Sequence, residues 1–520
     1  MTQAPERYGA QRVRRSLLHF VLGKSAGALI GLAWLFTLVR VMPEADYGAY
    51  FTFYAYIEVM LLLSAWGSVQ LMERFVPELH EQHRDGEVAR LASALLRWRG
   101  LLLIGTVALL QWAQQPVLGL LGLQDYAQVF WLINGLLLAE GLCRMVDSFH
   151  EGLLMQRKSQ FSVLFRNGIK TLTLLYMTVG DQTLSLQHWL QLELGLMALA
   201  LLWSGGLYLA TRSSLLRKAP VAGQALDWRR YWRYGLYIFG CQLVWLLTSF
   251  DTLKIAVTRG FGLDAAALLG FCLALVLVVQ RYLPTYLLAG MARPLFIVAR
   301  QRADMADRLR QLSALFFKLN LAPLLPLLLL SCLYEDRLLQ LSSGGKFDAG
   351  GGVLSLLLAL LIVQALKNCQ ALVITALEDG QGALFGSVVA ALVFGGSALL
   401  LLPMGVQGLL LALLLAELAS LAVQHGRIAR QGVRMGLPLM PLLKMALANG
   451  LALGLTLMLA RASGLSASLE LGLALMACGV GTLAVLARSY FDAGERARLA
   501  ALLPAGLAGF LGRLTAGGGR

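Results

Sequence analysis

Charged side chains stand inside several long apolar stretches of this chain. Glu140, Arg144 and Asp147 share one such stretch at spacings of four and three residues, which place them on one face of a helix. One interpretation is a salt-bridge cluster in which the arginine bridges both carboxylates and stabilises a helix bundle. The other is a cavity wall whose carboxylate exchanges a proton or a cation. The sequence leaves both open.

Cations in the next stretch indicate a binding site for an anion. Arg166 and Lys170 lie four residues apart on one helical face, where they repel each other unless an anion lies between or opposite them. Glu140 or Asp147 would serve, and so would a phosphate. Arg166 can extend to the membrane surface, whereas Lys170 is about 15 Å along its helix, too deep to extend comfortably. Lys170 is therefore the better candidate for substrate contact.

Three cations in other stretches extend the candidate anion site. Lys24 lies about two turns inside the first helix, where its side chain can also extend to the surface. Arg281 and Lys367 are expected near mid-span with no acid close by in sequence. A charge at that depth costs at least ~2.5 kcal/mol, so we expect these two cations to bind an anion.

Four acids within the spans remain to be explained. Asp251 and Lys254 are three residues apart and can neutralise each other. Glu58, Glu193 and Glu417 are lone acids in three different stretches. They are either partners of the cations above or sites that couple transport to H⁺ or Na⁺.

Other chemistries are not indicated. The 6 cysteines are scattered singly, without the spacing of metal ligands, and we expect neither a metal nor a bound cofactor. No nucleophile–base arrangement is evident, and the outer loops are too short to build an active site. We therefore do not expect an enzyme.

The composition predicts an all-α polytopic membrane protein with about fourteen transmembrane helices. Hydrophobic residues make up 58% of the chain and charged residues 14%, and the mean hydropathy is +0.68. The apolar stretches are continuous rather than alternating, which favours helices over a barrel. They fall near 17–39, 48–71, 95–113, 127–149, 160–180, 188–210, 232–257, 265–291, 311–333, 353–376, 383–402, 407–425, 439–460 and 467–487.

The basic residues predict the orientation. Most of the 44 Lys and Arg fall in segments that alternate helices place on one side of the membrane. This asymmetry predicts that both termini are cytoplasmic. The resemblance described below implies that the membrane is a bacterial inner membrane. It also accounts for the net charge of +15, so nucleic-acid binding is not expected.

The chain divides into two six-helix lobes with two further helices. We expect an amphipathic N-terminus at 1–16, an N-lobe at 17–210, a basic linker at 211–231, a C-lobe at 232–425, two helices within 426–487 and an amphipathic tail at 488–520. Arg40 and Arg259 end the first helix of each lobe. Arg74 and Arg293 are separated by the same number of residues as Arg40 and Arg259. Six helices separate equivalent points, so the repeat is parallel.

Residues 40–78 carry a resemblance to a known family. Arg40-Val41-Met42-Pro43-Glu44-Ala45-Asp46-Tyr47-Gly48-Ala49-Tyr50 resembles the "AR-x-LGPEDYGLY" segment of the Wzx-like polysaccharide-biosynthesis flippases, with Val-Met in place of Leu-Gly. These belong to the multidrug/oligosaccharidyl-lipid/polysaccharide (MOP) exporter superfamily. Gly67 followed by Arg74-Phe75-Val76-Pro77-Glu78 is similar to that family's "G…RFxPE". The motif residues are Arg40, Asp46, Tyr47, Gly48, Arg74 and Pro77.

The resemblance implies a flippase that works by alternating access. Its implied substrate is an undecaprenyl-diphosphate-linked oligosaccharide for O-antigen lipopolysaccharide, capsule or exopolysaccharide. A glycosyltransferase or polymerase of the same pathway is an expected partner. A fourteen-helix count is also that of lipid II flippases, in which the extra helices form a groove for a lipid tail. Two further functions fit the residues: a cation-coupled small-molecule exporter similar to the MATE transporters, and a non-transporting subunit of a polysaccharide synthase complex.

Overall fold

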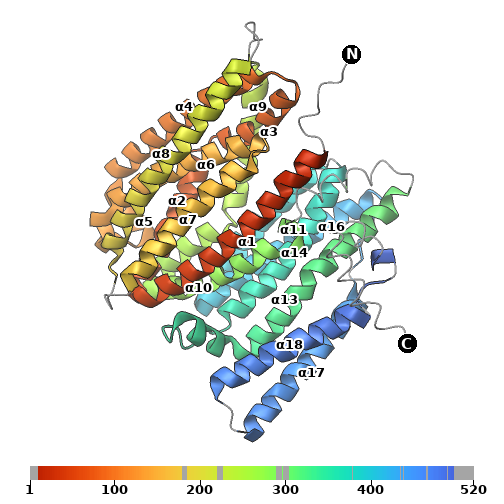
Figure 1. Cartoon of the computed structure of the whole chain (residues 1–520). Coiled ribbons are helices and arrows are strands. Elements are labelled where there is room, and N and C mark those ends of the chain that lie inside the picture. The colour runs from red at the N-terminus through yellow and green to blue at the C-terminus, as the bar shows by residue number, and fades with distance from the viewer. Residues whose placement is uncertain are drawn as a thin grey trace. The chain divides into compact units, whose positions relative to one another are not determined.

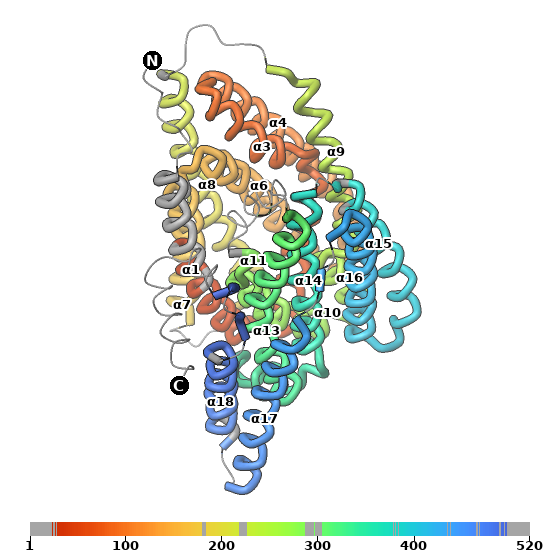
Figure 2. Tube along the Cα trace, turned by 90° about the vertical axis from the view of Figure 1, so that its right-hand side faces the viewer, coloured from red at the N-terminus to blue at the C-terminus, as the bar shows by residue number. Residues whose placement is uncertain are grey.

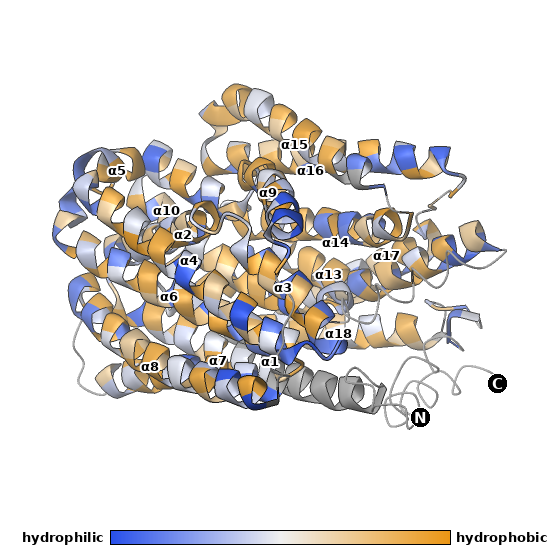
Figure 3. Ribbon diagram, turned by 90° about the horizontal axis from the view of Figure 1, so that it is seen from above, coloured by the Kyte–Doolittle hydropathy of each residue, from blue (hydrophilic) through white to orange (hydrophobic). Residues whose placement is uncertain are grey.

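The computed structural model describes residues 10–178, 184–218, 226–287, 296, 304–377, 379–433, 435–436, 438–463, 466–488, 490–492 and 494–496. Every regular element within these ranges is a helix, as the apolar stretches predict. Hydrophobic residues make up long stretches of these helices (Figure 3). The protein is a multi-pass helical membrane protein. Its helices form two compact units, Met1–Phe271 and Cys272–Arg520.

The first unit is a bundle built mainly on α6 and α8. Its central helices are α1 (Ala10–Val41), α6 (Phe130–Gly152), α7 (Gln156–Thr178) and α8 (Leu186–Lys218). Helix α1 packs along α7 (Figure 1), and α6 contacts both α4 and α8. The remaining elements are α2 (Glu44–Leu63), α3 (Ser68–Glu81), α4 (Asp85–Trp112), α5 (Gln114–Leu121), η1 (Gln124–Val129), α9 (Trp228–Leu246) and most of α10 (Phe250–Tyr282).

The second unit places α13 (Met305–Ser343) between two helix pairs. On one side it contacts α14 (Val353–Leu377), which packs on α16 (Gly405–Arg430), and α16 in turn pairs with α15 (Gly380–Leu401). On the other it contacts α17 (Leu439–Ser463) and α18 (Ala467–Arg488), which run side by side (Figure 2). Two short elements, α11 (Pro284–Leu287) and η2 (Leu402–Met404), complete the unit.

Each of the fourteen predicted stretches overlaps helix in the structure. Among the described residues, nine helices are long and apolar enough to cross a membrane, and a tenth span is formed if bent α2 and α3 are counted together. Two of the nine, Trp228–Tyr282 and Leu384–Arg430, are each interrupted by a break. The polar α7 and the partly described α1 supply the other stretches.

One predicted break between helices is misplaced. The sequence analysis ends a helix at 257 and begins the next at 265, but α9 already ends at Leu246 and α10 starts at Phe250. The Thr248 and Ser249 backbone amides turn back onto α9, and the Ser249 hydroxyl accepts from the Thr252 amide at 3.2 Å, which starts a new helix. A second break lies at Gly262, where φ is +88°. Arg259 therefore precedes this break, as Arg40 precedes the end of α1.

A buried arginine holds the bend between α2 and α3. The two helices meet at 59°, with Trp66 and Gly67 in the left-handed region. Arg99 of α4 is buried beside this bend and donates to the Leu61 carbonyl at 2.8 Å and to the Ser64 hydroxyl at 3.2 Å. The guanidinium thus binds a carbonyl that the end of α2 leaves free.

Two motif glycines allow helices to touch along the first unit. A Cβ on Gly48 of α2 would clash with the Leu263 carbonyl oxygen of α10, and a Cβ on Gly67 would clash with that of Gly235 in α9. The family motif therefore marks places where backbones approach closely.

Replacing Gly48 with valine should destabilise the protein by about 3 kcal/mol, because the new side chain pushes α2 away from α10. Thermal unfolding of the purified protein in detergent measures this loss. Gly105→Val is the matched control, since a Cβ at the exposed Gly105 of α4 meets nothing within 4 Å. Equal unfolding temperatures for the two variants would contradict the close approach.

Candidate functional site

Most of the predicted charged residues of the first unit lie in one cluster. The cluster combines side chains from five helices: Trp34 (α1), Tyr50, Tyr54 and Glu58 (α2), Glu140, Arg144 and Asp147 (α6), Arg166 and Lys170 (α7) and Glu193 (α8). Neighbouring helices pack through these faces, so the pairs form across helices as well as along them. We call this set the N-unit cluster.

Glu193 forms the buried end of the N-unit cluster. Its side chain is 0% exposed and forms an ion pair with the Lys170 ammonium group. The Tyr50 hydroxyl donates to Glu193 Oε2 at 3.1 Å, and the Tyr54 hydroxyl donates to Oε1. The Lys170 nitrogen also lies 5.4 Å from the Trp34 ring centroid. A buried carboxylate needs such partners, because desolvation without them costs several kcal/mol.

Arg144 forms the accessible end. Its Nη1 and Nη2 donate to both carboxylate oxygens of Glu58 at 2.7 and 2.5 Å, and its Nε donates to Glu140 at 2.8 Å. The side chains of Arg144 and Glu58 are 42% and 35% exposed. A bidentate pair that is partly exposed within a span must face water, because contact with lipid tails would be strongly unfavourable.

The predicted partners of Arg144 are half correct. The sequence analysis predicts that Arg144 bridges Glu140 and Asp147 on its own helix. In the structure Arg144 pairs with Glu140, but its second acid is Glu58 of α2 and not Asp147. Asp147 instead pairs with Arg166 of α7, with Nη2 and Oδ2 3.5 Å apart. The fork geometry of a guanidinium explains this choice, since Glu58 can accept two parallel bonds.

The two cations of α7 find acids on neighbouring helices. Arg166 faces Asp147 of α6, and Lys170 faces Glu193 of α8. Asp147 Oδ1 and Arg166 Nη1 are buried and have no hydrogen-bond partner among the described residues. Lys170 therefore has a carboxylate partner in Glu193, which is one of the two possibilities that the sequence left open for this acid. The paired residues of the cluster comprise four acids and three cations, so any anion must displace a carboxylate.

The predicted cations of the second unit have different surroundings. Lys367 of α14 donates to Glu417 of α16 at 2.6 Å, so it too pairs with one of the lone acids that the sequence offered as possible partners of the cations. Arg281 is exposed in the last turn of α10 and not near mid-span, because the helix ends at Tyr282 before Pro284. No ion pair joins Arg281 to the described residues. A cation in the last turn interacts favourably with the helix dipole.

Two remaining predictions concern Lys24 and the Asp251–Lys254 pair. The side chain of Lys24 lies outside the described residues. Lys254 donates to Asp251 at 2.7 Å, and its nitrogen lies 4.5 Å from the Phe51 ring centroid. This pair fixes α10 against α2 in the first unit, which favours a structural role.

The family-motif residues join helix ends. Asp46 accepts from the Tyr126 hydroxyl at 3.1 Å and from the Leu186 amide, at the start of α8, at 2.9 Å. Near the C-terminal end of α3, Arg74 and Arg230 both contact Glu78, at 3.1 and 2.9 Å. Tyr47 is buried, and Pro77 lies inside α3. The motif thus serves the architecture of the first unit.

An apolar groove of about 600 Å³ lies in the second unit. Helices α13, α14, α16 and α17 form its walls, so it differs from a groove made by the last two helices alone. Its lining is hydrophobic throughout: Phe317, Leu321, Leu325, Ile362, Val363, Leu366, Leu418, Leu421, Leu439, Met440, Leu442, Leu443 and Ala446. We call it the apolar groove.

Comparison with known proteins places this architecture. No family model matches the chain, and no curated protein matches it in sequence. Among solved structures, it is similar to the lipid II flippase MurJ in an inward closed conformation, with a TM-score of 0.63 at 12% identity, over 89% of this chain and 97% of that one. It is also similar to an inward-facing MATE-family multidrug resistance transporter of the MOP superfamily, with a TM-score of 0.62 at 13% identity, over 78% and 95%.

The same transporter family in an outward-facing conformation gives a TM-score of 0.54 at 12% identity, over 83% of this chain and 98% of that one. The chain shares its fold with these transporters. Within this fold the N-unit cluster belongs to the first unit and the apolar groove to the second. Arg99 and Glu193 are the residues whose importance the sequence understated. The sequence signal for Arg99 was its position near the start of an apolar stretch.

Proposed function

We propose that the protein is a transporter that flips a lipid-linked glycan precursor across a membrane by alternating access. The apolar groove carries this proposal. A hydrophobic groove of about 600 Å³ would bind a small hydrophilic solute poorly, whereas a prenyl chain can bury its apolar surface there. The fold shared with a lipid II flippase supports the assignment.

The phosphates of the carrier lipid are proposed to bind the cations. Arg144 is the most accessible cation of the N-unit cluster, and a diphosphate would compete with Glu58 for its two parallel hydrogen bonds. Lys170, Arg166, Lys367, Lys24 and Arg281 remain proposed contacts. Protonation of Glu193 would release Lys170 for the substrate, which would couple transport to H⁺; Na⁺ exchange at the same carboxylate would couple it to Na⁺ instead.

We propose that the protein lies in the inner membrane of a bacterium with both termini in the cytoplasm. The concentration of Lys and Arg on one side of the predicted spans supports this orientation. The substrate would be an undecaprenyl-diphosphate-linked oligosaccharide for polysaccharide synthesis, with a glycosyltransferase or polymerase of that pathway as partner.

Export of small molecules is the second candidate. The likeness to MATE transporters and the buried carboxylate Glu193 support it. A groove variant separates the two. Ala446→Trp should fill part of the apolar groove and slow lipid flipping about tenfold in proteoliposomes, because displacing two methylene groups costs about 1.6 kcal/mol at ~0.8 kcal/mol each.

Leu451→Trp is the matched control, because Leu451 is exposed on α17 and is not among the groove residues. It should flip lipid at the wild-type rate. Wild-type flipping by Ala446→Trp, or drug efflux by the wild type without lipid flipping, would favour the exporter.

A further inference from the structure

The segment that follows α18 folds back onto α13. Tyr490 and Phe491 are buried in a cluster with Leu315 and Met445, and the Tyr490 hydroxyl donates to the Lys318 carbonyl at 2.8 Å. The hydrophobic contacts fix the position of the segment relative to α13 and α17.

This segment brings a carboxylate to a buried lysine. Lys318 Nζ donates to both oxygens of Glu495 at 2.8 Å, and each side chain is 9% exposed. Asp492 orients the acid: its amide donates to Glu495 Oε2 at 3.0 Å, and its own Oδ1 accepts from the Glu495 amide at 2.7 Å. Such reciprocal bonds resemble a capping box.

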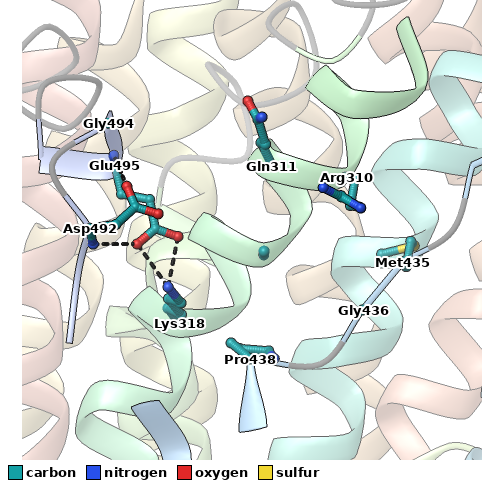
Figure 4. Close-up of a pocket in the computed structure, with 10 residues that line it drawn as sticks. Arg310, Gln311, Lys318, Met435, Gly436, Pro438, Asp492, Gly494 and Glu495 are labelled. Atoms are coloured by element: carbon teal, nitrogen blue, oxygen red, sulfur yellow. Dashed lines mark hydrogen bonds and ion pairs between the residues drawn. The ribbon is translucent and has the colours of Figure 1, made fainter. Parts of the chain in front are cut away.

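The Lys318–Glu495 pair forms one wall of a cavity of about 620 Å³ (Figure 4). Arg310 and Gln311 also line it, on the same face of α13 as Lys318, and Met435 and Pro438 form the opposite side. Arg310 contacts Asp307 only at 3.8 Å, and both side chains are more than half exposed. Its charge is therefore little neutralised. The cavity lining also holds Lys318 and the two acids Asp492 and Glu495, so Arg310 is the one cation there without a close acid among the described lining residues.

We propose that this cavity binds the phosphate of an amphiphile and that Glu495 is an internal carboxylate which the phosphate replaces on Lys318. A phosphate carries more charge and more acceptor oxygens than a carboxylate, so it can engage Lys318 and Arg310 together. The amphiphile is inferred from the neighbouring residues. Phe317 and Leu439, adjacent in sequence to Lys318 and Pro438, line the apolar groove, so an attached chain has a hydrophobic surface close by.

Binding of fluorescent phosphatidylglycerol to the full-length protein in detergent tests the site. Diacylglycerol with the same fluorophore is the phosphate-free reference. Glu495→Gln should raise the affinity about tenfold, because it leaves Lys318 without its acid while keeping the side-chain volume. Lys318→Met in that background should remove the gain. Glu470→Gln is the matched control, since Glu470 of α18 also forms an ion pair with a cation of α13, Arg337, but lies outside the cavity.

Arg310→Gln keeps the proposal testable if Glu495→Gln does not fold, because Arg310 is exposed and its loss leaves no buried acid. It should lower the affinity of the otherwise wild-type protein severalfold. Competition by inorganic pyrophosphate would assign the site to a diphosphate lipid, and its absence would assign it to a common phospholipid. Equal binding of phosphatidylglycerol and diacylglycerol, or an unchanged affinity in Arg310→Gln, would overturn the proposal.

Discussion

Replacing Lys170 with methionine is expected to destabilise the protein by about 3–5 kcal/mol and to abolish transport. Among the described residues, the change leaves the fully buried Glu193 with the Tyr50 and Tyr54 hydroxyls as its hydrogen-bond partners. A buried charge without its counter-charge is among the largest single destabilising changes that a side chain can make. Thermal unfolding in detergent and flipping in proteoliposomes measure the two effects.

The double variant Lys170→Met/Glu193→Gln separates stability from function. Removing both charges should restore most of the lost stability, since no charge is left buried, but should not restore transport, because Lys170 and Glu193 are the proposed substrate and coupling groups. Lys367→Met/Glu417→Gln provides a comparison at one ion pair of the second unit. A single Lys170→Met variant as stable as the wild type would show that this pair is not what the structure indicates.

Replacing Arg144 with glutamine should lower the rate of flipping by about 10- to 100-fold, the value of one or two charge-assisted hydrogen bonds of ~1.5–3 kcal/mol. Its effect on unfolding should be smaller than that of Lys170→Met, because the Arg144 and Glu58 side chains are partly exposed to water. Arg144→Lys keeps the charge but loses the parallel bonds, and we expect an intermediate rate.

Glu58→Gln is the informative partner of this variant. It leaves Arg144 with Glu140 alone and removes the acid that a phosphate must displace. The apparent KM for the lipid substrate should therefore fall. An unchanged KM in Glu58→Gln together with a wild-type rate in Arg144→Gln would exclude this end of the N-unit cluster from substrate binding.

The helices could be predicted from the sequence because each apolar stretch carries its own signal. Boundaries at 247–249 and Gly262 could not, since they depend on a local turn of Thr and Ser and on a positive φ. Glu140 and Arg144 could be paired because they are neighbours on one helix. The pairs Arg144–Glu58, Lys170–Glu193 and Lys367–Glu417 depend on how separate helices are rotated and aligned, which the hydrophobic pattern does not specify.

The same limit explains the missed residues. Arg99 lies near the start of a predicted span, where an arginine usually extends to the surface, and only the bend of α2 against α3 brings free carbonyls to it. Glu495 lies in a stretch that the sequence assigns to an amphipathic tail, yet 177 residues separate it from its partner Lys318. A contact between residues so far apart in the chain leaves no recognisable pattern in the sequence around either residue.

Flipping of an undecaprenyl-diphosphate oligosaccharide in proteoliposomes is the most direct test of the central claim. The purified protein should bring a fluorescently labelled lipid within reach of a membrane-impermeant quencher, at a rate that Arg144→Gln and Ala446→Trp both reduce. Vesicles that contain Leu451→Trp should match the wild type. Transfer no faster than in protein-free vesicles, under either sign of an imposed proton or sodium gradient, would contradict the assignment as a lipid-linked glycan flippase.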